Sequence, residues 1–268
     1  MTAKRKISIR YSCYFNFSRA GEQFSPTHTI GYVVSGAFEL NDGKTTQLYK
    51  KGDVYFCKRN SLLKYAKEPP ENGEFRSISI SFDEEFLRRI GVEYNFSIDN
   101  DFELPAFQSL PPNSILSHFM ESLAPYEQVF NEADNDDLLM VKQKEAILLL
   151  LQIKPELKNV LFSFADPGKI DLEDFMNQNF HFNVQLIRFA YLTGRSLSTF
   201  KRDFEKKFNT TPSRWLLKRR LQEAYYLLKE KGRAVTDIYL DLGFEDLSHF
   251  SFAFKKQFGL SPSELKKA

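Results

Sequence analysis

Residues 194–213 read GRSLSTFKRDFEKKFNTTPS, and residues 243–263 repeat the same pattern as GFEDLSHFSFAFKKQFGLSPS. Each copy carries three phenylalanines at intervals of four residues, which are Phe200, Phe204 and Phe208 in the first and Phe250, Phe254 and Phe258 in the second. Residues four apart lie on the same face of a helix. The repeat therefore predicts two similar helices, each with one apolar face turned inward.

A short helix and a glycine turn precede each of these helices. The apolar periodicity predicts the short helices at residues 184–192 and 235–242, followed by Gly194 and Gly243. Glycine can adopt the left-handed conformation that closes a helix. Ser196 and Asp246 are suitable N-caps for the helices that follow. A helix, a glycine-containing turn and a second helix form a helix-turn-helix unit, and the chain is expected to contain two.

The segment between the two copies predicts a long connecting helix at residues 212–231. Thr211 can cap this helix and Pro212 suits its first turn. Its polar side is expected to carry Lys218, Arg219 and Arg220. A last helix should begin with the capping box formed by Ser261 and Glu264.

The first third of the chain has a different periodicity. Residues 7–82 show short apolar strands separated by glycine turns, such as Asn41-Asp42-Gly43 and Lys51-Gly52-Asp53. Residues 30–40 suggest a strand pair or one strand bent at Gly36. Residues 75–82 alternate strictly between apolar residues and serines. This pattern predicts a small β-barrel or sandwich.

Helical periodicity begins after about residue 83, with helices expected at residues 84–90, 114–129 and 136–153. The last of these is apolar all round at residues 147–151, so it either lies fully buried or offers a second surface to a homodimer partner. Residues 165–168 (Ala-Asp-Pro-Gly) mark the best domain boundary. The expected fold class is α+β, with an N-terminal β-barrel domain flanked by helices and an all-α C-terminal domain.

Composition limits the possible partners and compartments. Basic residues outnumber acidic ones from Asp166 onward, whereas acidic residues are in excess before it, which favours a polyanion as the partner of the C-terminal part. With two cysteines and no apolar run of membrane-spanning length, a reduced, cytoplasmic protein without membrane contact is expected. The basic N-terminus lacks the apolar core of a signal peptide.

The residues needed for catalysis or metal binding do not form a recognisable pattern. The histidines, which are His28, His118, His181 and His249, are scattered, and Cys13 and Cys57 lack metal-site spacing. Phosphate-binding glycine loops and nucleophile elbows are also missing. We therefore expect neither an enzyme, a metal nor a cofactor. A small apolar effector could bind among Tyr32, Phe38, Tyr55 and Phe56, although these aromatics also suit a plain core, and a regulatory protein is the alternative partner.

The C-terminal hundred residues resemble the DNA-binding domain of the AraC/XylS family of transcription regulators. The resemblance rests on residues 194–216, on KRRLQEAYYLL at 218–228 and on IYLDLGFEDLSHFSFAFKKQFGLSPSEL at 238–265. It implies seven helices, helix-turn-helix units at about 183–208 and 235–258, consecutive major-groove segments on one DNA face, and control of RNA polymerase, usually activation. Residues 1–164 resemble, more weakly, the degenerate cupin regulatory and dimerisation domains that precede such modules, through GYVVSGAFEL at 31–40 and KKGDVYF at 50–56.

The resemblance also assigns DNA-contacting residues. In the first recognition helix the base-facing positions match Ser198, Lys201 and Arg202, with Lys206 and Lys207 as phosphate candidates. In the second, the matching positions are Leu247, Ser248, Ser251 and Phe252, with His249, Lys255 and Lys256 as phosphate candidates.

Phe252 departs from the family, in which many members carry arginine at this position. A phenylalanine can contact a thymine methyl group but cannot donate a hydrogen bond. The second unit is therefore expected to act mainly as a backbone clamp on double-stranded promoter DNA. The alternative is a protein-interaction module whose helical domain no longer binds DNA specifically.

Overall fold

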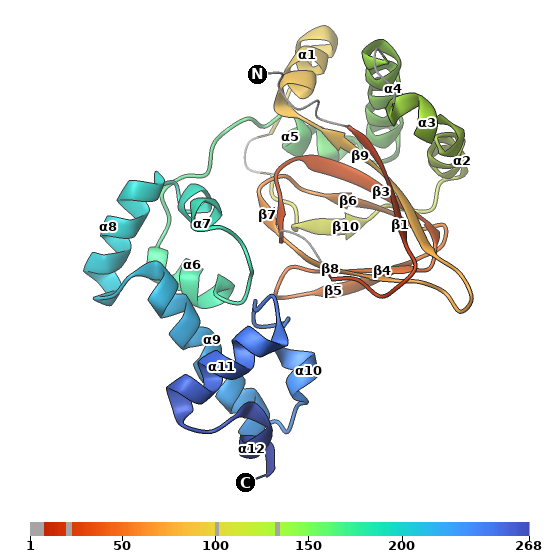
Figure 1. Cartoon of the computed structure of the whole chain (residues 1–268). Coiled ribbons are helices and arrows are strands. Elements are labelled where there is room, and N and C mark those ends of the chain that lie inside the picture. Colours follow the sequence, from red (N-terminus) through yellow and green to blue (C-terminus); the bar gives the residue numbers. More distant parts are fainter. Residues whose placement is uncertain (1–7, 20–22, 100–101, 132–134, 268) are drawn as a thin grey trace. The chain divides into compact units, whose positions relative to one another are not determined.

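The computed structural model describes residues 8–19, 23–99, 102–131 and 135–267 (Figure 1). The chain divides into two compact units, Met1–Ala165 and Asp166–Ala268, which we call the N-terminal and C-terminal domains and describe separately. Residues 1–7, which include the basic N-terminus, lie outside the described residues.

Strands dominate the first half of the N-terminal domain. They are β1 (Ile9–Tyr14), β2 (Phe24–Ser25), β3 (His28–Ser35), β4 (Ala37–Asn41), β5 (Thr46–Lys50), β6 (Val54–Cys57), β7 (Ser61–Leu62), β8 (Lys64–Glu68), β9 (Phe75–Phe82) and β10 (Phe107–Ser109). One sheet has the strand order β1-β9-β3-β6-β10, a second has β5-β4-β8, and β2 pairs with β7. All recorded pairings are antiparallel. Strand β10 is short and was not predicted from the sequence.

Gly36 marks the corner between the two larger sheets. Strands β3 and β4 lie on either side of it but belong to different sheets, so of the two predicted alternatives the bend is correct and the strand pair is wrong. Gly36 has φ +80, and a Cβ atom here would lie 2.3 Å from the carbonyl oxygen of Glu68. A residue with a side chain would therefore not fit at this corner.

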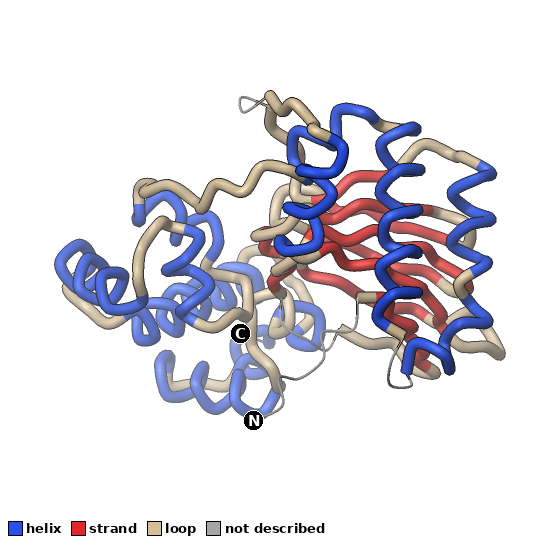
Figure 2. Tube along the Cα trace, turned by 90° about the horizontal axis from the view of Figure 1, so that it is seen from above, coloured by secondary structure: helices blue, strands red, loops and turns tan. Residues whose placement is uncertain are grey.

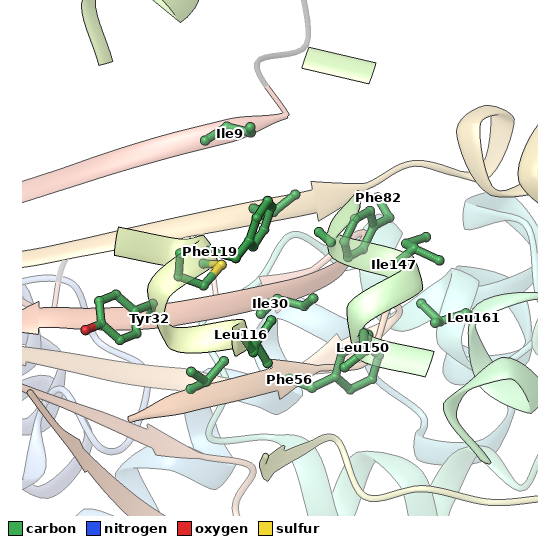
Figure 3. Packing of buried hydrophobic residues seen from close by; sticks show 14 of the residues in the cluster. Ile9, Ile30, Tyr32, Phe56, Phe82, Leu116, Phe119, Ile147, Leu150 and Leu161 are labelled. Atoms are coloured by element: carbon green, nitrogen blue, oxygen red, sulfur yellow. The ribbon is translucent and has the colours of Figure 1, made fainter. Parts of the chain in front are cut away.

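Strand β9 separates two environments by its alternation. Ile78 and Ile80 pack under the helices on the outer face of the five-stranded sheet, where they join Phe56 and Leu150 in one large core (Figure 3). The serines of β9 point the other way, into the space between the sheets, where they line a cavity together with residues of β4 and β8. The predicted alternation is confirmed, and the serine face of β9 lines the cavity inside the domain.

The helices of the N-terminal domain cover one face of the five-stranded sheet (Figure 2). They are α1 (Glu84–Tyr94), α2 (Ser114–Ser122), η1 (Ala124–Tyr126), α3 (Glu127–Asn131), α4 (Asp136–Ile153), η2 (Pro155–Leu157) and α5 (Lys158–Leu161). The prediction of one helix over residues 114–129 is wrong. Pro125 lies in the middle of that range, and its ring and missing N–H convert the chain to a 3₁₀ turn between α2 and α3.

Helix α4 has both a buried and an exposed apolar face. Ile147 and Leu150 are fully buried, and the side-chain amide of Gln143 donates to the carbonyl oxygen of Ser81 at 2.7 Å. On the opposite side, Val141 is 56% exposed and Leu148 is 38% exposed. The interpretation of α4 as a fully buried helix is therefore wrong, because its apolar surface exceeds what the sheet covers.

The C-terminal domain is helical throughout its described residues, 166–267. Its seven helices are α6 (Leu172–Asn179), α7 (Leu186–Leu192), α8 (Leu197–Phe208), α9 (Pro212–Lys229), α10 (Val235–Ile238), α11 (Leu247–Phe258) and α12 (Pro262–Lys267). The predicted capping box is present, since the Ser261 N–H donates to the Glu264 carboxylate at 2.6 Å and the Glu264 N–H to the Ser261 hydroxyl at 3.3 Å. Thr211 occupies the N-cap position of α9 without a side-chain hydrogen bond.

The α+β class predicted from the sequence is confirmed, with a sheet-rich first domain and a helical second one. In the part of the chain that the structure describes, no helix is both long and apolar enough to span a bilayer.

Candidate nucleic-acid interface

The first helix-turn-helix unit consists of α7, a tight turn and α8. Gly194 has φ +65 at the turn, as the sequence predicted for a helix-closing glycine. Beside it, the buried hydroxyl of Thr193 donates to the carbonyl oxygen of Phe189 at 2.9 Å. The guanidinium of Arg195 donates to the carbonyl oxygen of Thr193 at 2.6 Å and to the carboxylate of Asp203 on α8 at 3.1 Å. The turn is thus fixed against the helix that follows it.

Helix α8 presents a polar face to solvent. The Ser196 hydroxyl accepts from the Thr199 N–H at 3.2 Å, which confirms the predicted N-cap. Phe200 and Phe204 are fully buried, and Phe208 packs on Trp215 with ring centroids 5.0 Å apart. All five predicted contact residues of this helix are exposed, namely Ser198, Lys201, Arg202, Lys206 and Lys207.

Arg202 lies at the centre of this exposed face. Its side chain is 77% exposed. Its ion pair with the Asp203 carboxylate is long at 3.7 Å, so the guanidinium can still donate to another partner. Lys207 differs, because its ammonium pairs with Glu173 at 2.8 Å. Sequence reasoning missed Glu205, which is exposed three residues after Arg202 and therefore lies on the same face. A carboxylate there can accept from the N4 amino group of cytosine.

The second unit has a shorter first helix than predicted. Helix α10 ends at Ile238, and the expected continuation to residue 242 is a series of turns that ends at Gly243, where φ is +80. The Asp246 carboxylate accepts from the His249 N–H at 2.6 Å, which confirms Asp246 as the N-cap of α11. Buried Phe250 and Phe254 repeat the arrangement of α8.

The exposed face of α11 is less polar than that of α8. Leu247 is 38% exposed and Phe252 is 70% exposed. Ser248 and Lys255 are exposed, whereas Ser251 is half-buried. His249 is exposed but lies at the edge of this face, with its ring centroid 6.0 Å from that of Phe244. The structure thus brings the predicted residues of α11 onto one surface, with His249 at its margin.

Helix α9 connects the two units. Lys218 is exposed as predicted, and Arg219 forms an intrahelical ion pair with Glu223 at 3.0 Å. The assignment of Arg220 to the solvent-facing side is wrong. Its guanidinium donates 2.8 Å hydrogen bonds to three backbone carbonyl oxygens, and burial lowers its pKa to about 10.

The four aromatic residues considered for effector binding belong to two different cores of the N-terminal domain. Tyr32 and Phe56 belong to the core under the helices (Figure 3). Phe38 and Tyr55 instead line the cavity of about 430 Å³ between the sheets. The same cavity is lined by Arg10, Lys67 and hydroxyl-bearing residues, namely Ser12, Ser25, Thr27, Thr29, Ser77, Ser79 and Ser81. Its wall therefore combines aromatic, hydroxyl-bearing and basic side chains.

Metal-ligating and thiol groups are dispersed among the described residues. No cluster of three or more histidine, cysteine or acidic side chains with metal-site geometry occurs in the ranges given above. Both cysteines are free thiols, and burial raises the pKa of Cys57 to about 12. The pKa of the exposed Cys13 thiol is also raised, because the thiol donates to the Glu74 carboxylate, so the surroundings of both thiols disfavour the reactive thiolate.

Helices α8 and α11 are each N-capped, preceded by a glycine turn and exposed on the side opposite their phenylalanines. Joined by the long helix α9, they define a double helix-turn-helix DNA-binding domain. The comparison with protein families agrees with this architecture. Residues 189–268 match a model described as a helix-turn-helix domain, and residues 28–160 match one described as the ExsA N-terminal regulatory domain.

Three curated relatives extend over much of the chain. The chain is 22% identical to the HTH-type transcriptional regulator ExsA of Pseudomonas aeruginosa, over 96% of this chain and 92% of that protein. It is 25% identical to the virulence regulon transcriptional activator VirF of Yersinia enterocolitica, over 87% of each chain. It is 30% identical to the HTH-type transcriptional activator RhaS of Escherichia coli, over 58% of this chain and 55% of that protein.

Because both the regulatory and the DNA-binding domains are matched, the chain belongs to the AraC/XylS family and is a DNA-binding transcription regulator.

Proposed function

We propose that this protein is a cytoplasmic activator of transcription, without catalytic activity, that binds double-stranded promoter DNA and recruits RNA polymerase. Helices α8 and α11 would enter consecutive major-groove segments, since the groove is wide enough for an α-helix. The observation that carries the proposal is the exposure of Arg202 at 77% on a helix whose Phe200 and Phe204 are fully buried. The activating role is supported by relatives named as activators.

The two recognition helices are assigned different tasks. On α8, Arg202 and Lys201 can donate to guanine O6 and N7, Ser198 is permissive, and Lys206 is placed for a phosphate. Glu205 on the same face would favour cytosine. In this assignment α8 supplies most of the base recognition.

Helix α11 is proposed to clamp the backbone next to that segment. Phe252 and Leu247 can contact thymine methyl groups. The hydroxyl groups of Ser248 and Ser251 can bond to either a donor or an acceptor on a base edge. Lys255 is the main phosphate contact of this helix, with His249 at its edge. Because phosphate contacts fix position without recognising sequence, this helix adds affinity more than specificity.

The decisive experiment is selection of binding sites from random duplexes with the full chain. We expect a two-segment operator in which the better-defined segment lies under α8. Arg202→Ala protein should select a segment with relaxed preference, whereas Lys44→Ala, an exposed lysine of the β4–β5 turn in the other domain, should reproduce the wild-type site. Failure of the wild-type chain to enrich any sequence would favour a protein-interaction module instead.

The cavity between the sheets is the proposed effector site of the N-terminal domain. Its basic residues Arg10 and Lys67 and its serines favour a polar ligand with a negative charge over the apolar effector inferred from the sequence. Thermal-shift measurements on the full chain with pools of small carboxylates and phosphates test this site, with Ser79→Phe as the variant that fills it. A regulatory protein recovered from the native host, with no small-molecule shift, would replace this proposal.

A second copy of the chain is proposed to cover the exposed face of α4. The observation in favour is the apolar stripe of Met140, Val141 and Leu148, which the sheet leaves uncovered. Sedimentation of the wild type at micromolar concentration should give a dimer, and Val141→Glu should give a monomer. A wild-type monomer under these conditions would contradict the dimer.

A further inference from the structure

A single arginine in the connecting helix joins parts of both helix-turn-helix units. Arg220, in the middle of α9, donates from Nε to the carbonyl oxygen of Phe180 and from Nη2 to that of Phe182, both at 2.8 Å. Its Nη1 donates to the carbonyl oxygen of Gly243, also at 2.8 Å. The three nitrogens of the guanidinium are thus each used by a backbone oxygen.

These three carbonyl groups come from two distant segments. Phe180 and Phe182 belong to the loop that leads into α7, the first helix of the first unit. Gly243 lies in the turn of the second unit, just before α11. A second hydrogen bond joins the same two segments, since the Asn183 amide donates to the Glu245 carboxylate at 3.1 Å.

The turn of the second unit approaches the guanidinium closely. A Cβ atom on Gly243 would lie 2.9 Å from Cζ of Arg220 and 2.9 Å from the carbonyl oxygen of His181. Contacts under 3 Å leave no room for a side chain, so glycine is required by proximity as well as by its φ of +80. The turn of the second unit is therefore packed closely against both the guanidinium and the loop before α7.

The turn of the first unit is held differently, by an arginine of its own. Arg195 bonds to Thr193, to the Ile170 carbonyl oxygen at 3.1 Å and to Asp203. These partners lie within that unit or, in the case of Ile170, just before α6. The second unit instead depends on an arginine that is simultaneously bonded to the entry of the first.

We propose that Arg220 is a positioning residue that sets the spacing and rotation between α8 and α11 on DNA. The inference rests on the proposed function, in which the two helices enter consecutive groove segments. With the guanidinium in place, the start of α11 is fixed relative to the loop before α7. Without it, the second recognition helix can still fold but can shift against the first.

An arginine is specifically suited to this position. Its planar fork presents five N–H donors in fixed directions, whereas lysine offers a compact ammonium that cannot reach three divergent carbonyls at once. Although burial lowers the pKa of Arg220 to about 10, the group stays protonated at neutral pH. Replacement by lysine therefore keeps the charge and removes the geometry.

The test measures selectivity for operator spacing. The operator selected with the wild-type chain is compared with versions that carry one extra base pair between the segments, which rotates the second by about 34° because a turn takes 10–10.5 bp. We expect the wild type to prefer the native spacing by about tenfold, because the extra base pair moves the thymine methyl groups proposed to contact Leu247 and Phe252 out of register with the segment under α8. Arg220→Lys should reduce this preference by about tenfold.

The spacing ratio separates positioning from a loss of folded protein. A partly unfolded variant binds both operators less by the same factor, so its ratio is unchanged. Asn183→Ala removes the exposed hydrogen bond to Glu245 between the same two segments, and it should reduce the preference for the native spacing by about two- to threefold. Arg214→Lys, an exposed arginine on the same helix, is the matched control and should leave the ratio at the wild-type value.

An unchanged spacing ratio in both Arg220→Lys and Asn183→Ala would overturn the inference. That outcome is distinct from failure of the proposed function, in which the wild-type chain selects no two-segment operator. Intrinsic fluorescence of Trp215, the one tryptophan in the sequence, reports whether each variant of the C-terminal domain is folded.

Discussion

The imidazole Nδ1 of His28 accepts a hydrogen bond of 3.2 Å from the backbone N–H of Arg59. The ring is buried and stacks on Phe56 with centroids 5.6 Å apart. Since Nδ1 is an acceptor, the folded domain requires the neutral imidazole. Burial, together with the charges of Arg59 and Lys58, lowers the pKa of His28 from 6.5 to about 3.

This pKa predicts that acid destabilises the N-terminal domain. Between pH 6.5 and about 3 the unfolded chain binds a proton at His28 that the folded chain does not, so the contribution is complete above pH 6.5 and is lost as the pH falls. At 1.36 kcal/mol per pKa unit, lowering the pH from 7 to 5 should cost about 2 kcal/mol of unfolding free energy. Urea titrations followed by far-UV circular dichroism measure it.

Two variants separate His28 from other acid effects. His28→Gln, which keeps an acceptor, should flatten the pH dependence, whereas His118→Gln, at an exposed site, should not. The fluorescence of Trp215 monitors the other domain in the same samples. An equal loss of stability in wild type and His28→Gln would show that other groups are responsible.

Arg202 and Lys255 should differ in how they affect DNA binding. Arg202→Ala is expected to weaken specific binding by about 1–3 kcal/mol and to relax base preference. Lys255→Ala should reduce the slope of log affinity against log salt by about 1, with little change in preference. Gel-shift titrations at several salt concentrations distinguish the two. Unchanged affinity of Arg202→Ala for the selected operator would remove Arg202 from the interface.

Gly194 and Gly232 form a matched pair for testing backbone constraint. Both have positive φ, +65 and +62, but a Cβ at Gly194 would lie 2.5 Å from the carbonyl carbon of Gly168, whereas Gly232 has open space. Gly232→Ala should cost about 1 kcal/mol, the strain of left-handed backbone alone. Gly194→Ala should cost roughly 3 kcal/mol or more, because the clash adds to the strain. Denaturant unfolding monitored by Trp215 fluorescence measures both losses of unfolding free energy. Equal losses for Gly194→Ala and Gly232→Ala would contradict the prediction.

The helix-capping role of Asp246 and the effect of its negative charge on DNA binding can be tested separately. Asparagine caps helices about as well as aspartate, so Asp246→Asn should keep the stability of the C-terminal domain within about 0.5 kcal/mol, whereas Asp246→Ala should lose about 1 kcal/mol. Removing the charge next to phosphate should raise DNA affinity about two- to fivefold at low salt. A drop in affinity for Asp246→Asn would instead indicate that the carboxylate itself contacts the DNA.

The sequence predicted those features that depend on local periodicity. The phenylalanine intervals located α8 and α11, and the glycine and cap positions located their turns, because these signals lie within a few residues of the structure they determine. Pro125 is also visible in the sequence, and because proline does not fit a helix interior it accounts for the 3₁₀ turn that divides the helix predicted at 114–129.

Long-range contacts explain what could not be predicted. Arg220 follows Lys218 and Arg219 in a polar run, and nothing nearby in the chain indicates that it bonds to carbonyl groups forty residues before and twenty-three residues after it. The same holds for Phe56 and Tyr55, neighbours on β6 that point to opposite faces of the sheet. Which face borders the cavity follows from the pairing of distant strands.

Arg202 and Phe252 occupy equivalent positions in the two copies of the repeat, and this inequality has an evolutionary consequence. A side chain that donates hydrogen bonds penalises a wrong base more than an apolar one does. We therefore expect promoters under this regulator's control to accumulate more substitutions under α11 than under α8. In an alignment of the regulator's genomic binding sites, sequence conservation should therefore be concentrated in the segment under α8.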